Sequence, residues 1–383
     1  MNRRWVYMDN AATTRMNAKA YEAMLPYYRE KFANASGFYG FSAESKRVLK
    51  DAREFFAGAL NGNPEEIYFT SGGSESDNWA ISYGRGGHII TSSIEHNAVL
   101  NPCRNAEKAG TKVTYVIPDE NGFINPQNIE DAIRKDTRLI SVMMANNEIG
   151  TIQDVAAIGR IAGWYGICFH TDAVQAFGHI PIDVKKAGIK MLSISAHKFG
   201  GPKGIGVLYV SKEVPIKPFI LGGGQENERR SGTENIPAIK AMTVAAEEAV
   251  KNMRENGIKM TEMRDYMIDE FAKRIPGMRV NGDRKQRLPG NINISIKGIE
   301  GRNLVAVLDS MGICASAASA CSAAKKGLSH VLEAIEVPHD MIGGSLRLTL
   351  SPETTWREVE YVVNSVCMAV EQMRNNKKNI NKG

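Results

Sequence analysis

Short apolar runs alternate with helix-sized stretches through much of the chain, and this alternation restricts the possible folds more than any other feature. The runs are rich in β-branched and aromatic residues and nearly continuous in apolar character, as strands buried on both faces are. They lie at 67–71, 88–93, 112–117, 138–144, 168–173, 191–196 and 206–211. Helical patterns at 97–109, 126–135 and 155–164 separate several of them. The repetition predicts an α/β fold with a mainly parallel sheet.

The pattern changes after residue 235. Residues 237–275 predict one long helix, and short strands and helices then follow at 279–281, 291–296, 301–310, 345–350 and 355–373. A chain of 383 residues is long enough for two domains. We expect a large domain over 15–255 and a smaller α+β domain formed by 1–14 and 256–383, with the 237–275 helix as a bridge.

Composition and charge exclude several classes of protein. Hydrophobic residues make up 43% and charged residues 23%, which argues against disorder. The net charge of +6 comes partly from residues 374–383, so it does not by itself indicate a nucleic-acid partner. No apolar run of about 18 residues predicts a membrane span. Five cysteines without a CxxC pair, and no secretory leader pattern, favour the reducing cytoplasm.

Two glycine-rich segments follow predicted strands. In 70–78 (TSGGSESDN), Gly73 and Ser74 begin a helix whose free N–H groups could bind an anion, although a plain capped helix is an equal alternative. In 193–206 (SISAHKFGGPKGIG), Lys198 follows a strand, but the segment matches neither a dinucleotide fingerprint nor a Walker loop. Lys198 is a candidate Schiff-base lysine, with a surface loop lysine as the alternative.

Three further residues have a context that favours chemistry. Asp172 ends an apolar strand, where open α/β sheets place ligand contacts, although it could also simply cap a helix. His96 follows a strand in the same way, although a lone histidine is more often structural. Cys321 lies among small residues in 313–322 (ICASAASACS), which makes it the candidate reactive thiol of the chain's cysteines.

Taken together, these segments resemble one family. The chain is similar to the cysteine desulfurases of the class-V aminotransferase group, which are pyridoxal-phosphate (PLP) enzymes of fold type I. Such enzymes have a large PLP-binding domain and a smaller C-terminal domain. The matching segments occur in family order at 7–14, 67–81, 92–100, 143–154, 169–175, 193–210, 222–235, 288–295, 318–322 and 345–351.

The resemblance implies a set of cofactor contacts. Lys198 would carry PLP as a Schiff base, Asp172 would keep the ring nitrogen protonated, and Gln175 would hydrogen-bond the phenolic oxygen. His96 would stack on the ring and assist proton transfer. Contacts with the phosphate are implied for Gly73, Ser74, Ser195, His197 and, from the neighbouring subunit of a homodimer, Thr233. No metal site is expected.

The same resemblance implies the substrate and the product. Arg347 would bind the carboxylate of L-cysteine through its fork of donors, and Asn147 would assist at substrate and cofactor. Cys321 would receive the sulfur as a persulfide while L-alanine is released. An acceptor protein such as an iron–sulfur scaffold, or a thiolation system, would then take the sulfur.

Other functions stay open at the level of sequence. A selenocysteine lyase or another class-V aminotransferase or lyase would share the scaffold, and fold alone does not separate them. Cys321 favours desulfurisation because a transaminase needs no such thiol. A catalytically silent PLP-binding partner protein is the non-enzyme alternative. Neither a membrane nor a direct nucleic-acid contact is expected.

Overall fold

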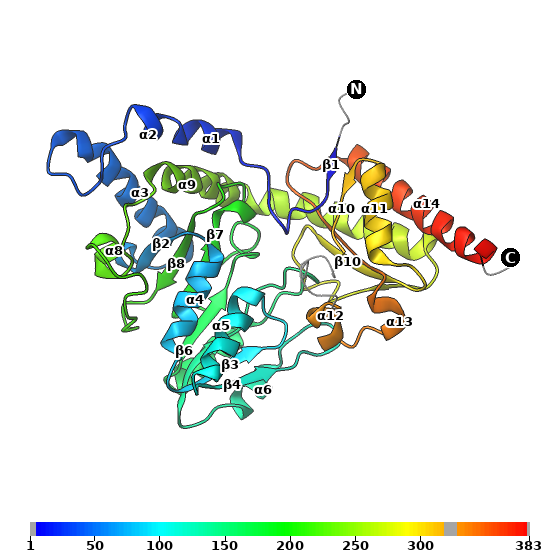
Figure 1. Ribbon diagram of the computed structural model, residues 1–383, viewed down its shortest axis with the longest axis horizontal. Coiled ribbons are helices and arrows are strands. Elements are labelled where there is room, and N and C mark those ends of the chain that lie inside the picture. Colours follow the sequence, from blue (N-terminus) through cyan, green and yellow to red (C-terminus); the bar gives the residue numbers. More distant parts are fainter. Residues whose placement is uncertain (1–4, 318–327, 381–383) are drawn as a thin grey trace.

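A seven-stranded sheet forms the centre of the larger part of the molecule (Figure 1). The structure is a computed structural model that describes residues 5–317 and 328–380. The strand order is β2 (Ile67–Thr70), β8 (Gly206–Val210), β7 (Met191–Ser195), β6 (Cys168–Asp172), β5 (Thr137–Ser141), β3 (His88–Ser92) and β4 (Lys112–Val116). Only β8 runs antiparallel to its neighbours β7 and β2. The mainly parallel α/β sheet predicted from sequence is confirmed.

Helices cover both faces of this sheet. Successive strand residues point to opposite faces, so Ile90 and Ile140 join one apolar cluster while Ile89 and Leu139 join another. The first cluster includes residues of α1 (Ala18–Met24), α2 (Pro26–Arg29), α3 (Ala43–Leu60), α6 (Pro126–Asp131), α7 (Val155–Trp164) and α9 (Ile236–Lys251). The second includes residues of α4 (Gly73–Tyr83) and α5 (Asn97–Lys108). Short helices are η1 (Gly40–Ser42), η2 (Pro64–Glu66), η3 (Ala196–Lys198) and α8 (Gln225–Glu228).

A second part of the molecule is built on a three-stranded antiparallel sheet with the order β12 (Ser345–Thr349), β10 (Asn291–Ile296) and β9 (Met278–Val280). A separate apolar cluster joins this sheet to α10 (Met253–Arg274), α11 (Gly301–Ser310) and α14 (Trp356–Ile380). Val6 and Met8 belong to the same cluster, and β1 (Val6–Tyr7) pairs in parallel with β11 (Ile313–Cys314). The N-terminal segment therefore packs with C-terminal residues.

Two short helices near the C-terminal end of the chain pack against the part of the molecule that contains the seven-stranded sheet. They are α12 (His330–Ala334) and α13 (His339–Ile342). Val331, Leu332 and Ile342 pack in the cluster of the seven-stranded sheet, not in that of the three-stranded sheet. The domain limits 15–255 and 256–383 stay a prediction.

The prediction of a single helix over 237–275 is wrong, because the helix is interrupted at residue 252. Two helices, α9 and α10, meet at Asn252, whose φ of −100° and ψ of 6° depart from helical values. Its side-chain Nδ2 donates to the carbonyl of Glu248 at 3.0 Å. Asparagine side chains compete with the helical backbone in this way, so a break here has a local cause. In Figure 1 the two helices lead from the first part of the molecule to the second.

Within the described ranges, none of the helices combines the length and apolar character that a membrane span requires.

Candidate active site

A cavity of about 370 Å³ opens at the carboxyl ends of β6 and β7 and reaches β12 of the second part. Many of the residues selected from sequence line it together: Gly73, Ser74, His96, Asn147, Asp172, Gln175, Ser195, His197, Lys198 and Arg347. Thr233 is exposed and does not line this cavity. Cys321 lies outside the described residues. The fold thus brings residues from the two parts of the molecule to one place.

Lys198 ends the short helix η3, which follows β7 directly. Its ammonium Nζ donates to the carbonyls of Ala11 at 2.6 Å and Ala12 at 2.8 Å. Gln175 donates through Nε2 to the Ala11 carbonyl at 3.0 Å. The N-terminal segment therefore orients the lysine side chain inside the cavity, a contact that sequence reasoning did not predict.

Asp172 ends β6 and, although it is buried, lines the cavity. Its Oδ1 accepts the backbone N–H of Val174 at 2.8 Å. Burial raises the pKa of this carboxyl, while that hydrogen bond and the charges of His96 and Lys198 act in the opposite direction. A buried carboxylate of this kind favours a cation brought next to it, such as a protonated ring nitrogen.

His96 immediately precedes α5 and caps its first turn. Its Nδ1 accepts the N–H of Ala98 at 3.1 Å, so the neutral ring carries its hydrogen on Nε2. Burial lowers the pKa of His96, which keeps the imidazole neutral near pH 7. A neutral ring can lie against an aromatic ligand, and its Nε2–H can donate a hydrogen bond.

The N-terminal end of α4 forms part of the cavity wall. Gly72 has a φ of +144°, which favours glycine, and a Cβ on Gly73 would lie only 2.7 Å from Cγ2 of Val174. The first N–H groups of a helix have no intrahelical acceptors, so this glycine-lined turn can hold an anion. His197 lies on the same cavity and contacts Thr13 Oγ1 through Nδ1 at 3.1 Å. Burial lowers the pKa of His197 to about 4.

Sequence reasoning missed Asp77, another carboxylate that lines the cavity. Its Oδ1 has no hydrogen-bond partner among the described residues and lies 3.7 Å from Nε2 of the buried His170. Burial raises the pKa of Asp77 well above its usual value, and the charge of Asp172 adds to this. The available signal was its spacing, because Asp77 lies one helical turn after Gly73.

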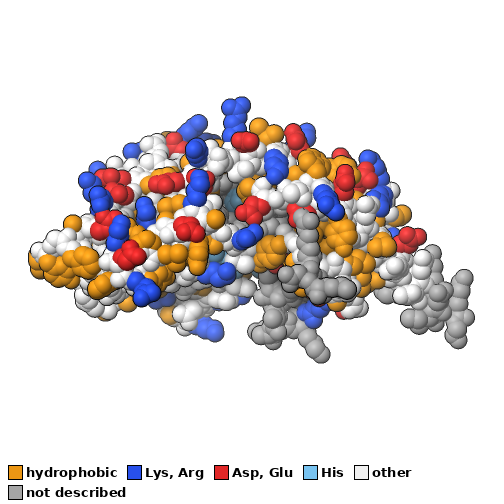
Figure 2. All heavy atoms as spheres, turned by 90° about the horizontal axis from the view of Figure 1, so that it is seen from above, with side chains coloured by type: hydrophobic (Ala, Val, Ile, Leu, Met, Phe, Trp, Pro, Cys, Tyr) orange, Lys and Arg blue, Asp and Glu red, His pale blue; other side chains and the backbone are white. Residues whose placement is uncertain are grey.

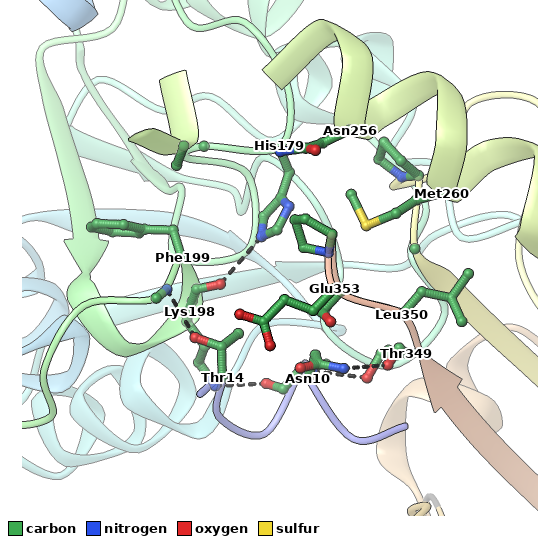
Figure 3. Close-up of a pocket in the computed structure, with 18 of the residues that line it drawn as sticks. Asn10, Thr14, His179, Lys198, Phe199, Asn256, Met260, Thr349, Leu350 and Glu353 are labelled. Carbon is green, nitrogen blue, oxygen red and sulfur yellow. Dashed lines mark hydrogen bonds between the residues drawn. The ribbon is translucent and has the colours of Figure 1, made fainter. Parts of the chain in front are cut away.

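A second cavity of about 280 Å³ also has Lys198 in its lining (Figure 3). Its lining includes Thr14, His179 and Met260, and it shares Ala11, Gln175 and Lys198 with the first cavity. Nε2 of His179 contacts the carbonyl of Lys198 at 3.2 Å. Lys198 is therefore held at its backbone carbonyl by His179 and at its Nζ by the carbonyl of Ala11, a residue that lines both cavities.

Comparisons with known proteins agree with this geometry. The class-V aminotransferase family matches residues 6–362. The cysteine desulfurase IscS of Dictyoglomus turgidum is 47% identical over 378 residues, which covers 97% of this chain and 96% of that protein. The chain belongs to the class-V aminotransferases, in their cysteine desulfurase branch. Enzymes of this family depend on PLP.

Other members of the branch support the assignment. The cysteine desulfurase IscS of Methanosarcina thermophila is 48% identical over 376 residues, covering 97% of this chain and 93% of that protein. A solved NifS-like protein superposes with a TM-score of 0.90 at 36% identity, covering 96% of this chain and all of the other. The structure of SspA in complex with cysteine has a TM-score of 0.80 at 36% identity, covering 91% and 99%. Fold type I is therefore confirmed for this class-V enzyme.

Glu95, next to His96, gives this cysteine desulfurase a pH-dependent stability. Its Oε1 accepts from Ser92 Oγ at 2.6 Å and from the Met143 N–H at 2.9 Å, while Oε2 has no partner among the described residues. Burial raises the pKa of Glu95 to about 8. Between the unfolded pKa of about 4.3 and this value, the folded protein keeps a proton that the unfolded chain releases. Stability from this group is therefore full below the lower pKa and is lost as the pH rises through about 8.

We expect Glu95→Gln to remove that loss. At pH 8 the midpoint of thermal unfolding is expected to be on the order of 2–5 °C above wild type, and at pH 5 the two should nearly coincide. Thermal unfolding followed by circular dichroism at both pH values measures this difference. Glu65→Gln, at an exposed position, is the control and should leave the pH dependence unchanged. Equal pH dependence in Glu95→Gln and wild type would contradict the prediction.

Proposed function

We propose that the protein is a PLP-dependent enzyme that converts L-cysteine into L-alanine and holds the removed sulfur as a persulfide on Cys321. The observation that carries this proposal is the 370 Å³ cavity, which is lined by residues from both parts of the molecule. It combines a lysine, a buried carboxylate, a neutral histidine and a buried arginine within one lining. The names of the relatives support the same reaction.

The lining residues fit PLP by their chemistry. Lys198 would carry the cofactor, and the buried carboxylate of Asp172 would stabilise the charge on its ring nitrogen. Gln175 would bind the phenolic oxygen and His96 would lie on the ring face. The start of α4 suits a phosphate, because the first N–H groups of a helix are free to bind an anion. Glycine keeps this turn compact, since any larger residue at Gly73 would meet Val174. Side chains proposed to complete the phosphate site are Ser74, Ser195, His197 and, across a homodimer, Thr233.

When bound, PLP withdraws electrons from the Cα of an amino acid attached to it. In the proposed reaction Arg347 holds the substrate carboxylate. Asn147 lies next to Arg347, since its backbone carbonyl accepts a hydrogen bond from Nη1 of the arginine. The amine of Lys198 removes the Cα proton and can return a proton to the substrate. The imidazole of His96, which burial keeps neutral by lowering its pKa, lies beside the reacting atoms and assists these transfers.

The sulfur step uses the thiolate of Cys321. The thiolate sulfur attacks the sulfur of the substrate, forming an S–S bond, and the Cβ–S bond breaks with its electron pair left on carbon. That carbon takes up a proton and becomes the methyl group of alanine. The balance is L-cysteine plus enzyme thiol giving L-alanine plus enzyme persulfide, with no external oxidant. A thiolate is required because a thiol is a weak nucleophile.

We further propose a cytoplasmic homodimer that passes sulfur to an acceptor protein, such as an iron–sulfur scaffold. Large apolar side chains are exposed around the connection between α2 and α3, where Figure 2 shows hydrophobic side chains gathered at one end of the molecule. They are Tyr28, Phe32, Phe38, Tyr39 and Phe41. Such a patch suits a subunit contact. Lys and Arg are interspersed with Asp and Glu over the face seen in Figure 2, which gives no support to a nucleic-acid surface there.

The reaction products test this function. With L-cysteine and an excess of a thiol reductant to reduce the persulfide, holoenzyme is expected to release alanine and sulfide in equal amounts. An aminotransferase would instead form a keto acid and need a second keto acid as amino acceptor. L-Selenocysteine is assayed in parallel. Turnover of selenocysteine alone would identify a selenocysteine lyase and overturn the proposal.

A further inference from the structure

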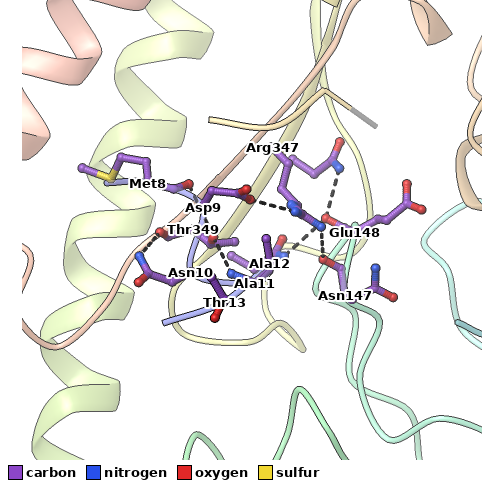
Figure 4. A network of polar contacts seen from close by, with 12 residues as sticks. Met8, Asp9, Asn10, Ala11, Ala12, Thr13, Asn147, Glu148, Arg347 and Thr349 are labelled. Atoms are coloured by element: carbon purple, nitrogen blue, oxygen red, sulfur yellow. Dashed lines mark hydrogen bonds and ion pairs between the residues drawn. The ribbon is translucent and has the colours of Figure 1, made fainter. Parts of the chain in front are cut away.

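We propose that Asp9 is a built-in counter-ion of Arg347, which positions the guanidinium and competes with the carboxylate of an incoming amino acid. Oδ1 of Asp9 lies 2.8 Å from Nη2 of Arg347 (Figure 4). The Arg347 side chain is 4% exposed and that of Asp9 21% exposed. Two opposite charges this close, with the guanidinium buried, interact more strongly than a fully exposed surface pair. The inference rests on the proposed role of Arg347 at the substrate carboxylate.

The guanidinium is held in place but retains donors for a ligand. Nη1 donates to the carbonyl of Asn147 at 3.1 Å and Nη2 to Asp9. A guanidinium carries five N–H donors, and the buried Nε of Arg347 has no partner among the described residues. Since Arg347 lines the cavity, a carboxylate can bind it while Asp9 remains in contact. The two anions would then share one positive charge.

Asp9 cannot easily withdraw, because its neighbours are fixed to β12. Asn10 Nδ2 donates to the carbonyl of Thr349 at 2.7 Å, and the N–H of Ala11 donates to Oγ1 of the same threonine at 2.9 Å. The backbone of Asp9 also forms a parallel bridge with Thr349. The segment therefore holds Asp9 beside Arg347 through contacts that do not involve its carboxylate.

The same segment also reaches the cofactor lysine. The carbonyls of Ala11 and Ala12 accept from Lys198 Nζ, two and three residues after Asp9. Residues 9–12 thus place a carboxylate on the proposed substrate arginine and carbonyl oxygens on the proposed cofactor lysine. Asp9 acts on the substrate through Arg347, so it is a positioning residue that sets the affinity of the carboxylate subsite.

Binding of L-alanine to the holoenzyme tests this inference without needing desulfurisation. Asp9→Asn keeps an oxygen acceptor for Nη2 but removes the negative charge. We expect Asp9→Asn to lower the dissociation constant of L-alanine roughly tenfold. Titration of the visible absorbance of bound PLP with L-alanine measures this constant. The KM for L-cysteine should fall in parallel, with a smaller change in kcat. Asp340→Asn removes an exposed carboxylate paired with Lys297 and should bind L-alanine as wild type does.

Two further variants separate the possible failures. Asp9→Ser also removes the charge and serves if Asp9→Asn does not fold. Arg347→Gln is expected to weaken L-alanine binding roughly 100-fold or more. If it binds like wild type, the proposed carboxylate subsite is wrong and the inference is overturned with it. If Arg347→Gln loses binding but the folded Asp9 variants bind no tighter than wild type, only the role of Asp9 is overturned.

Discussion

Lys198→Ala is expected to lose the visible absorbance of lysine-bound PLP and to produce alanine from cysteine roughly 10³- to 10⁴-fold more slowly than wild type. The amine of Lys198 is the proposed covalent anchor of the cofactor and the proposed base at Cα. No other lysine lines the main cavity among the described residues. Absorbance spectra after incubation with PLP and a fixed-time alanine assay measure both losses.

Lys203→Ala is the matched control for this variant. Lys203 lies in the same glycine-rich loop, five residues after Lys198, but its side chain is exposed. It should keep the cofactor absorbance and near-wild-type alanine production. The assignment of Lys198 fails if Lys198→Ala retains the absorbance band, or if wild type itself shows none after PLP is added.

Cys321→Ser is expected to keep the PLP absorbance but to form alanine and sulfide roughly 100-fold or more slowly than wild type. A serine hydroxyl is not ionised near pH 7 and cannot store sulfur as a persulfide. Binding of cysteine should persist, because the cavity residues proposed to hold it are unchanged. Spectral titration with cysteine and alanine quantification separate binding from sulfur transfer.

Cys367→Ser provides the corresponding cysteine control. Cys367 lies half-buried on α14, and burial raises the pKa of its thiol, so it is poorly suited to form a thiolate. This variant should retain wild-type activity. Alanine production by Cys321→Ser at the wild-type rate would remove Cys321 from the mechanism.

Local sequence patterns predicted the main sheet and singled out part of the cavity lining, namely Gly73, Ser74, His96, Asp172 and Lys198, while the family resemblance supplied the other predicted lining residues. Parallel strands end at the same edge of a sheet, so residues that follow them converge there. His96 follows β3, Asp172 ends β6 and Lys198 follows β7, and all three line one cavity. Their catalytic roles stay predictions, as does the role of Cys321, which lies outside the described residues.

Contacts between distant segments were not predictable in this way. The 237–275 pattern is helical throughout, yet the side chain of Asn252 bonds to the preceding turn at the point where α9 ends. Asp77 could be seen as a helix residue, but its place beside Asp172 depends on how α4 packs against the sheet. Periodicity describes which face of an element is apolar, not which polar group of another element it meets.

The alternation of strands and helices by itself determined the α/β class, because that pattern follows from the burial of each strand on both faces. Only the tertiary structure decided the surroundings of the two cationic side chains in the cavity. Asp9 and Arg347 are separated by 338 residues, and Lys198 bonds to backbone carbonyls that carry no side-chain signal. Such partners are set by the pairing of the N-terminal segment with β11 and β12, a long-range closure that local pattern does not encode.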